Sequence, residues 1–250
     1  MAQRRIALIT GANQGMGKAV ARELAADGHL VYLGSRDLRK GELAAAEIGS
    51  NAVALSLDVT DSASIQTAAD VVRLESGRLD LLINNAAAAS TRAAADMASL
   101  RAMVRPSVVP LDEIRTVWEV NAFGPLAVFQ AMLPLLRVSR DARIINVTSG
   151  LGSLASAADP DSAWRQIFDP VYAASKTALN ALSLAMSIEL EGSEVKVNVV
   201  SPGFANTALV RFQGTDTVED ASREIVRVAR LGPDGPTGTF TTWPGVPLAW

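Results

Sequence analysis

Residues Arg5–Gly17 read RIALITGANQGMG, and no other segment constrains the architecture as strongly. A short apolar run typical of a strand passes into three glycines spaced Gly-x3-Gly-x-Gly, and an amphipathic helical pattern follows. The glycines suit a tight turn, a close approach of backbone amides and close helix–strand packing. Because a helix N-terminus favours anionic oxygens, we expect this turn to bind a pyrophosphate through Gly11, Asn13, Gln14, Gly15, Met16 and Gly17. The alternative for such a turn alone is a tight strand–helix connection without a ligand.

The same rhythm of short apolar runs and helical patterns continues along the chain. Near-continuous apolar runs predict strands that are covered on both faces, at Arg5–Thr10, Leu30–Ser35, Ala52–Leu57, Leu79–Asn84, Arg143–Ser149, Val195–Val200 and Thr239–Thr242. Apolar residues at three- and four-residue spacings predict helices at Gly15–Ala26, Ser62–Glu75, Leu111–Val138 and Val171–Leu190. Asp61 or Ser62 is expected to cap the second helix. This pattern predicts an α/β fold, a single Rossmann-type doubly wound domain spanning residues 1–250.

Composition excludes several classes of function. The 250 residues carry a net charge of -3 and no cysteine, so disulfides, thiolate metal sites and a cysteine nucleophile are excluded. No basic run indicates nucleic acid or an anionic membrane as a partner, no cluster of ligands indicates a metal, and no segment approaches the length of a membrane span. We therefore expect a cytoplasmic protein. Long substrate-side loops are expected near residues 86–110, 151–170 and 203–217, since long loops in a compact domain are usually functional or mobile.

The end of the second strand bears on the choice of nucleotide. In doubly wound folds this position faces the adenosine ribose, where an acidic residue binds the 2′-hydroxyl and repels a 2′-phosphate. Here Ser35 can donate a hydrogen bond and Arg36 can pair with a phosphate, which favours NADP(H), although Asp37 follows immediately. Asp58 and Val59, after the third strand, are expected to hold the adenine.

Four polar residues form a candidate catalytic set. Tyr172 and Lys176 are four residues apart, so on a helix they share a face, and we expect the ammonium to lower the pKa of the tyrosine. Ser149 ends the fifth strand of a parallel sheet, where ligands gather and where a hydroxyl can bind a substrate oxygen. Asn121 is an unusual residue for a helical core and is expected to organise a water molecule.

In order along the chain, these features resemble the short-chain dehydrogenase/reductase family, with its carbonyl-reductase branch as the nearest pattern. The resemblance covers essentially the whole chain and rests on Thr10–Gly17, Asp58, Asn84, Asn85, Ala86, Asn121, Ser149, Tyr172, Lys176, Pro202, Gly203 and Thr207. It implies a sheet of about seven parallel strands and a tetrad in which Tyr172 donates the proton during reduction. Lys176 would hold the nicotinamide ribose, Ser149 would orient the carbonyl and Asn121 would support a proton relay. Cofactor contacts are implied for Asn85, Ala86, Pro202, Gly203 and Thr207.

The resemblance also implies reversible hydride transfer between NADP(H) and a carbonyl or secondary alcohol, and pairing of the helix around Tyr172 in a homodimer or homotetramer. Aromatic and aliphatic residues in the expected substrate loops indicate a largely apolar substrate: Trp164, Phe168, Phe204, Leu209 and Phe212. Departures from the family pattern are Ala87 in place of a glycine, Gln14 in place of a lysine, and a longer segment between Ser149 and Tyr172. Two alternatives remain open, a non-catalytic NADP(H) sensor and an epimerase or dehydratase of the same fold.

Overall fold

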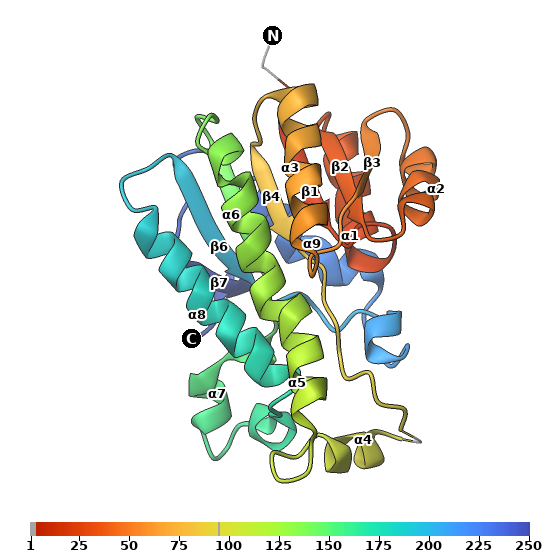
Figure 1. Cartoon of the computed structure of the whole chain (residues 1–250). Helices are drawn as coiled ribbons and strands as arrows, with labels where there is room; N and C mark the ends of the chain where they lie inside the picture. The colour runs from red at the N-terminus through yellow and green to blue at the C-terminus, as the bar shows by residue number, and fades with distance from the viewer. Residues whose placement is uncertain (1–3, 95) are drawn as a thin grey trace.

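The computed structural model describes residues 4–94 and 96–250 and contains one eight-stranded sheet in the order β3-β2-β1-β4-β5-β6-β7-β8 (Figure 1). The seven strands that run parallel are β1 (Ile6–Thr10), β2 (Leu30–Ser35), β3 (Ala52–Ser56), β4 (Leu81–Asn84), β5 (Ala142–Val147), β6 (Val195–Val200) and β7 (Thr239–Thr242). The expected parallel sheet is confirmed, and β8 (Val246–Pro247), which pairs antiparallel with β7, is an addition to it.

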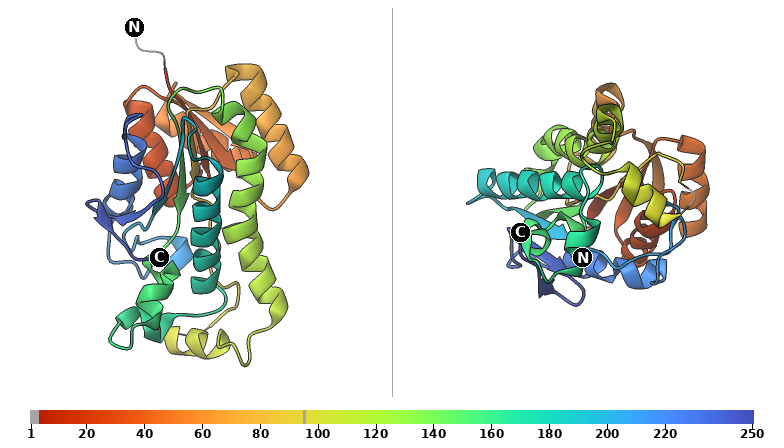
Figure 2. Two further views of the ribbon diagram at one scale, coloured as in Figure 1. Left: turned by 90° about the vertical axis from the view of Figure 1, so that its left-hand side faces the viewer. Right: turned by 90° about the horizontal axis from the view of Figure 1, so that it is seen from below.

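Helices cover both faces of this sheet, as the continuous apolar strands predict. One face packs against α3 (Ser62–Ser76), α6 (Gly124–Leu136) and α8 (Ala173–Glu189), and the other against α1 (Gly15–Ala26), α2 (Leu38–Ile48) and α9 (Val218–Ala229) (Figure 2). In β1, Leu8 belongs to the first core and Ala7 and Ile9 to the second, all fully buried. Successive side chains of a strand point to opposite faces, so an apolar β1 anchors both layers. Asp61 caps α3, because its carboxylate accepts the N–H of Ala63 at 2.9 Å.

The helix expected over Leu111–Val138 forms a rod with an irregular centre. It consists of α5 (Leu111–Trp118), a π-helical turn at Glu119–Phe123, and α6. This rod of 26 residues, Leu111–Leu136, is long and apolar enough to cross a membrane by length and composition, which corrects the expectation that no segment approaches that length. Half of its most apolar window is buried inside the protein, as in a core helix.

The sheet order places a site at one end of the molecule. The chain moves outward from β1 to β3 in one direction and from β4 onward in the other, so a crevice is expected at the carboxyl ends of β1 and β4. At that end lie two short helices, α4 (Met97–Met103) and α7 (Leu154–Ala158) (Figure 2). The segments expected to be loops therefore contain helical turns, including the 3-10 turns at Gly150–Gly152, Ala163–Ile167 and Ala208–Val210.

Candidate active site

The glycine-rich turn has the geometry of an anion cradle. Gly11 and Gly15 adopt positive φ angles of 64° and 57°, a region that residues with a Cβ atom rarely enter. A Cβ atom on Gly17 would lie 2.6 Å from both the Gly11 carbonyl oxygen and the Asn85 Nδ2 atom, so only glycine fits there. Gln14, the N-cap of α1, makes no side-chain cap hydrogen bond, which leaves the first N–H groups of the helix free of that competitor. The residues present therefore fit a dinucleotide phosphate.

The Asn85 side chain stabilises this glycine-rich turn by hydrogen bonds to its backbone. Its Nδ2 atom donates to the carbonyl oxygens of Thr10 (2.9 Å) and Gly11 (3.2 Å). The Thr10 hydroxyl in turn accepts the N–H groups of Asn85 and Ala86, each at 3.0 Å. Its amide donors therefore position the turn, and its expected place in the cofactor site stays a prediction. Ala87 has no positive φ angle, so it occupies the family's glycine position without the backbone strain that a left-handed conformation would impose.

At the ribose end of the crevice, the two residues expected to bind phosphate differ in availability. Ser35 is buried and its hydroxyl donates to the Asp37 carbonyl oxygen at 2.7 Å, so the expected hydrogen bond from Ser35 to a phosphate is not available in this arrangement. Arg36 is exposed. The Asp37 carboxylate caps α2 by accepting the Lys40 N–H at 3.2 Å and lies 3.7 Å from the Lys40 ammonium. The acidic residue beside Arg36 is thus engaged by the N-terminus of its own helix and faces the Lys40 ammonium.

The segment after β3 lies where the sequence predicts an adenine site. The Asp58 carboxylate accepts the N–H (2.9 Å) and the hydroxyl (2.7 Å) of Thr60, and these hydrogen bonds hold the pKa of Asp58 below its usual value. Val59 is buried and packs against Gly124, where an added Cβ would lie 3.0 Å from the Val59 carbonyl oxygen. Asp58 therefore stays ionised and fixed at the border of the crevice.

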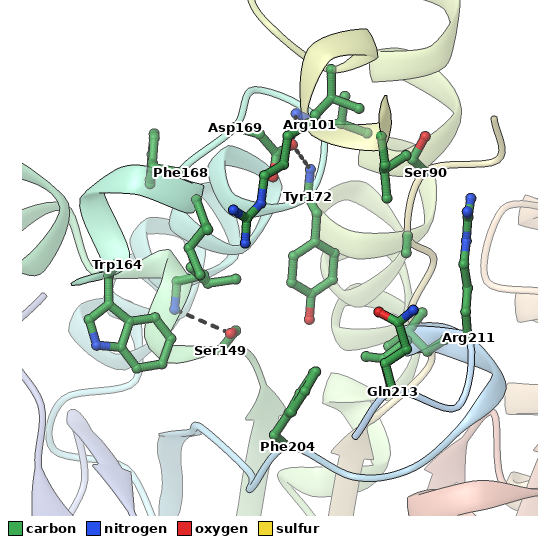
Figure 3. A pocket seen from close by; sticks show the side chains of 18 of the residues that line it. Ser90, Arg101, Ser149, Trp164, Phe168, Asp169, Tyr172, Phe204, Arg211 and Gln213 are labelled. Carbon is green, nitrogen blue, oxygen red and sulfur yellow. Dashed lines mark hydrogen bonds between the residues drawn. The ribbon is translucent and has the colours of Figure 1, made fainter. Parts of the chain in front are cut away.

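Ser149, Tyr172 and Lys176 converge at the carboxyl end of β5. Tyr172 is the N-cap of α8, so the helix begins two residues later than predicted, and its carbonyl oxygen accepts the Lys176 N–H at 3.0 Å. The buried Lys176 ammonium donates to the Val147 carbonyl oxygen at 3.0 Å and lies 5.8 Å from the centroid of the Tyr172 ring. Figure 3 shows the hydroxyls of Tyr172 and Ser149 pointing into the same cavity. The sequence-predicted trio is therefore assembled.

The electrostatics of this trio differ from the expectation. Burial raises the pKa of Tyr172 to about 12, the Ser149 hydroxyl acts in the opposite direction, and the charge of Asp169 adds to the rise. Burial also lowers the pKa of Lys176 to about 8. The prediction that the ammonium lowers the pKa of Tyr172 is therefore wrong for the protein without cofactor, since loss of hydration dominates for both groups. Tyr172 is a phenol at neutral pH, the form that can donate a proton.

Asn121 holds the π-helical turn to two neighbouring segments. Its Nδ2 atom donates to the Ala88 carbonyl oxygen (2.8 Å) and the Ser175 hydroxyl (2.9 Å), and its Oδ1 atom accepts the Ala88 N–H at 2.8 Å. The side chain is fully buried. Both amide protons are used in these contacts, which link the segment after β4 to α8. The expected role of Asn121 in organising a water molecule stays a prediction.

Asp169 is a site residue that the sequence reasoning missed. Its Oδ1 atom accepts the N–H groups of Val171 and Tyr172, both at 2.8 Å, and its carbonyl oxygen accepts the Ala174 N–H at 3.0 Å. These bonds fix the backbone that carries the Tyr172 ring. The available signal was an aspartate shortly before a helical pattern, a typical capping position.

A cavity of about 900 Å³ opens above the catalytic trio. Its wall includes four of the five apolar residues that the sequence places there, Trp164, Phe168, Phe204 and Leu209, together with Met16, Pro202, Gly203 and Thr207. Phe212 is not part of the lining, which corrects that prediction. Trp164 packs on Gly150, where an added Cβ would lie 2.8 Å from the indole. Thr207 lies between the cavity and the glycine turn, because a Cβ on Gly15 would meet its methyl group at 3.6 Å.

Two side chains that the sequence did not point to, Glu113 and Arg211, hold the segment of the cavity wall that follows β4. The buried Glu113 accepts hydrogen bonds from the Ser90 hydroxyl (2.7 Å) and from the N–H (2.7 Å) and hydroxyl (2.5 Å) of Thr91. The Arg211 guanidinium donates to the carbonyl oxygens of Arg92 (2.6 Å) and Ala94 (3.3 Å) and so connects the segments on the two sides of the cavity.

Comparison with known proteins agrees with this geometry. The family model described as short chain dehydrogenase matches residues 5–217, and the chain belongs to the short-chain dehydrogenase/reductase family, whose members are oxidoreductases that bind nicotinamide cofactors. It is 37% identical over 236 residues to the short-chain dehydrogenase anuI of Penicillium roqueforti (strain FM164), covering 91% of this chain and 89% of that protein.

Two solved structures extend the comparison. The structure of salutaridine reductase from Papaver somniferum superposes with a TM-score of 0.80 at 27% identity, covering 95% of this chain and 99% of that one. A metagenomic short-chain oxidoreductase in complex with NADP gives a TM-score of 0.74 at 25% identity, covering 95% and 96%.

Proposed function

We propose that this protein is an NADP(H)-dependent oxidoreductase that interconverts a carbonyl compound and the corresponding secondary alcohol. The observation that carries the proposal is the convergence of Tyr172, Ser149 and Lys176 beside a cavity with many apolar residues in its wall, which also reaches Met16 of the glycine turn. A hydride donor held by that turn and a proton donor in the cavity are what carbonyl reduction requires.

The residues of the chain have distinct tasks in this reaction. The glycine turn, Asp58 and Arg36 hold the nucleotide, whose nicotinamide supplies the hydride in reduction and accepts it in oxidation. The Ser149 hydroxyl donates a hydrogen bond to the carbonyl oxygen and positions it. Tyr172 transfers its phenolic proton to that oxygen as the hydride forms the new C–H bond, so the C=O bond becomes H–C–O–H. The Ser149 hydroxyl, which favours the ionised form, then stabilises the phenolate, and Lys176 would hold the nicotinamide ribose.

The preference for NADP(H) rests on charge at the end of β2. Arg36 is exposed there, and Asp37, the acidic side chain that would oppose a 2′-phosphate, is engaged with the N-terminus of α2 and with Lys40. A guanidinium beside an open crevice favours a phosphate over a hydroxyl. A related protein, 25% identical, has been solved in complex with NADP.

The test is calorimetric titration with NADPH and with NADH, followed by turnover of ketones, aldehydes and quinones with the nucleotide that binds tighter. We expect tighter binding of NADPH and reduction of apolar ketones. Binding without turnover across the panel would favour the sensor, and turnover without net redox change would favour an epimerase or dehydratase. Failure to bind either nucleotide would contradict the proposal.

A further inference from the structure

The substrate cavity is basic in an acidic protein. Three arginines line it, Arg101, Arg105 and Arg211, against one carboxylate, Asp169, whereas the whole chain carries a net charge of -3. A cleft lined by one sign of charge concentrates ligands of the opposite sign. The positive charge of the cavity is therefore local and does not follow from the charge of the whole chain.

Two of these arginines are available to a ligand. Arg101 and Arg105 are exposed, and among the residues that the structure describes no carboxylate lies within ion-pair distance of either. Figure 3 shows the Arg101 side chain extending from α4 into the cavity beside the ring of Tyr172. Arg105 uses its Nε atom on the Ala102 carbonyl oxygen at 3.3 Å, which leaves its terminal nitrogens free of that bond. Arg211 differs, because its terminal nitrogens are bound to backbone carbonyls.

The acidic N-cap of α4 and the one carboxylate of the cavity lining both accept hydrogen bonds from backbone N–H groups. Asp96 caps α4 by accepting the Ser99 N–H at 2.7 Å, and Asp169 holds the backbone of Tyr172. The glycine turn and Arg36, which the proposed function assigns to the phosphates of the nucleotide, lie on other elements than α4. An anion that meets Arg101 and Arg105 must therefore be part of the substrate.

The other residues of the cavity wall indicate the size and polarity of the rest of the substrate. The lining near α4 and Tyr172 includes five apolar residues, Leu100, Val104, Ile167, Phe168 and Val171, beside the polar Gln166. A volume of about 900 Å³ accommodates a ligand with one or more rings. A carboxylate is the planar anion that a guanidinium binds through two hydrogen bonds.

We infer that the preferred substrate is an amphipathic carboxylate, with an apolar body that carries the reacting carbonyl or alcohol and an anionic end that Arg101 and Arg105 bind. This inference rests on the proposed function for the reacting group but not for the anionic end. Arg101 and Arg105 are then specificity-determining residues on α4, and the reacting carbon lies toward Ser149 and Tyr172.

The first experiment measures binding alone, with a probe that cannot react. Calorimetric titration of the cofactor-loaded protein would compare 4-tert-butylbenzoate with the neutral 4-tert-butylbenzamide. We expect the carboxylate to bind about tenfold more tightly than the amide, and this preference to weaken as salt is raised. Arg101→Gln and Arg105→Gln should remove the preference while the affinity for the amide stays unchanged, and Arg101→Lys should retain part of it.

The matched control is Arg140→Gln, which removes the same charge from an exposed arginine before β5, outside the cavity. Equal binding of the two probes by the wild type would overturn the inference. So would an equal loss for Arg101→Gln and Arg140→Gln, or a change in melting temperature without a change in binding preference, since these results would mean that the arginines only stabilise the protein.

A second arm separates this inference from the proposed function. Reduction of 4-acetylbenzoate is compared with reduction of its neutral methyl ester, and kcat/KM should favour the acid by about tenfold in the wild type only. If no ketone is reduced while the carboxylate probe still binds through Arg101, the proposed reaction fails and the anion site stands. If both ketones are reduced equally well, the reaction stands and the anion site fails.

Discussion

Each side chain of the candidate catalytic site is held in position by contacts with particular neighbouring residues. Tyr172 depends on Asp169, which fixes its backbone, and on Ser149, whose hydroxyl lies beside its own. Lys176 is held by the Val147 carbonyl oxygen at the end of β5. The identities of Tyr172, Lys176 and Ser149 were predictable from their spacing and order. Asp169 was not singled out, because a capping aspartate is common and nothing in the sequence shows which tyrosine it holds.

Removal of the Tyr172 hydroxyl tests the proton transfer. Tyr172→Phe should lower kcat/KM for carbonyl reduction by about two to four orders of magnitude, because the Lys176 ammonium is directed to the Val147 carbonyl oxygen and does not take the place of the phenol. Calorimetry should give nearly unchanged nucleotide binding. A variant with near wild-type turnover would rule out Tyr172 as the proton donor.

The raised pKa of Tyr172 predicts a pH dependence with a definite sign. The chain has only two tyrosines, so the phenolate absorbance of the wild type minus that of Tyr172→Phe isolates this residue from Tyr32. In the cofactor-free protein we expect no phenolate from Tyr172 until the pH approaches its pKa of about 12. Reduction, which uses the phenol, should therefore keep its proton donor from about pH 6 to about pH 9, and oxidation, which uses the phenolate, should accelerate as pH rises. A phenolate signal near neutral pH without cofactor would contradict this.

Arg36 is tested by comparing two nucleotides. Arg36→Ala should weaken NADPH binding by about tenfold or more and leave NADH binding almost unchanged, since only the 2′-phosphate loses a charged partner. Arg140→Ala serves as the control for net charge. Equal losses for NADPH and NADH would show that Arg36 does not contact the 2′-phosphate.

Among the helices and strands, those whose boundaries are marked by specific residues were predictable from the sequence. Helix α1, strands β2, β6 and β7, and the start of α3 lie where the sequence places them, because glycines, a capping aspartate and continuous apolar runs mark their boundaries. Helices α2 and α9, which lie between recognised motifs, were not predicted from the sequence. The π-helical turn inside the long rod was also missed, since it depends on the contacts of Asn121 with Ala88 and Ser175 and not on a local pattern.

The cavity wall after β4 should depend on one buried carboxylate. Burial opposes the charge of Glu113, but hydrogen bonds from Thr91 and Ser90 outweigh it and hold its pKa below the usual value. A glutamine has only one acceptor oxygen, so Glu113→Gln should lower the free energy of unfolding by about 1–3 kcal/mol in chemical denaturation. Because the pKa is depressed in the folded state, the stabilisation is present above the usual pKa of a glutamate and is lost on acidification. The difference between wild type and variant should therefore shrink as pH falls through this range, and a constant difference would contradict the assignment.

At the scale of the whole molecule, α8 presents an uncovered apolar stripe. Ala181, Leu184, Ala185 and Ile188 are exposed at helical spacing, with Leu184 at 41% and Ile188 at 57% of full exposure. Their opposite side packs on the sheet. The family resemblance implies that this helix pairs with a second copy.

We predict that this stripe is a subunit interface. Ile188→Glu should shift the protein toward the monomer in light scattering, because a charge would be buried without a partner. Leu43→Glu on α2, another exposed apolar residue at 61% exposure, is the matched control and should leave the assembly unchanged. A wild type that is monomeric at high concentration, or an Ile188→Glu variant with the wild-type mass, would exclude this interface.

The contact between Trp164 and Gly150 has an optical consequence. The indole lies in the cavity wall and is partly exposed to the cavity, next to the segment that carries Ser149. Its fluorescence should therefore respond when an apolar compound displaces water from the wall, and subtraction of a Trp164→Phe variant would isolate that signal from the other three tryptophans. The enzyme thus carries an intrinsic reporter of ligand entry, which would allow unlabelled compounds to be screened by emission before any product is known.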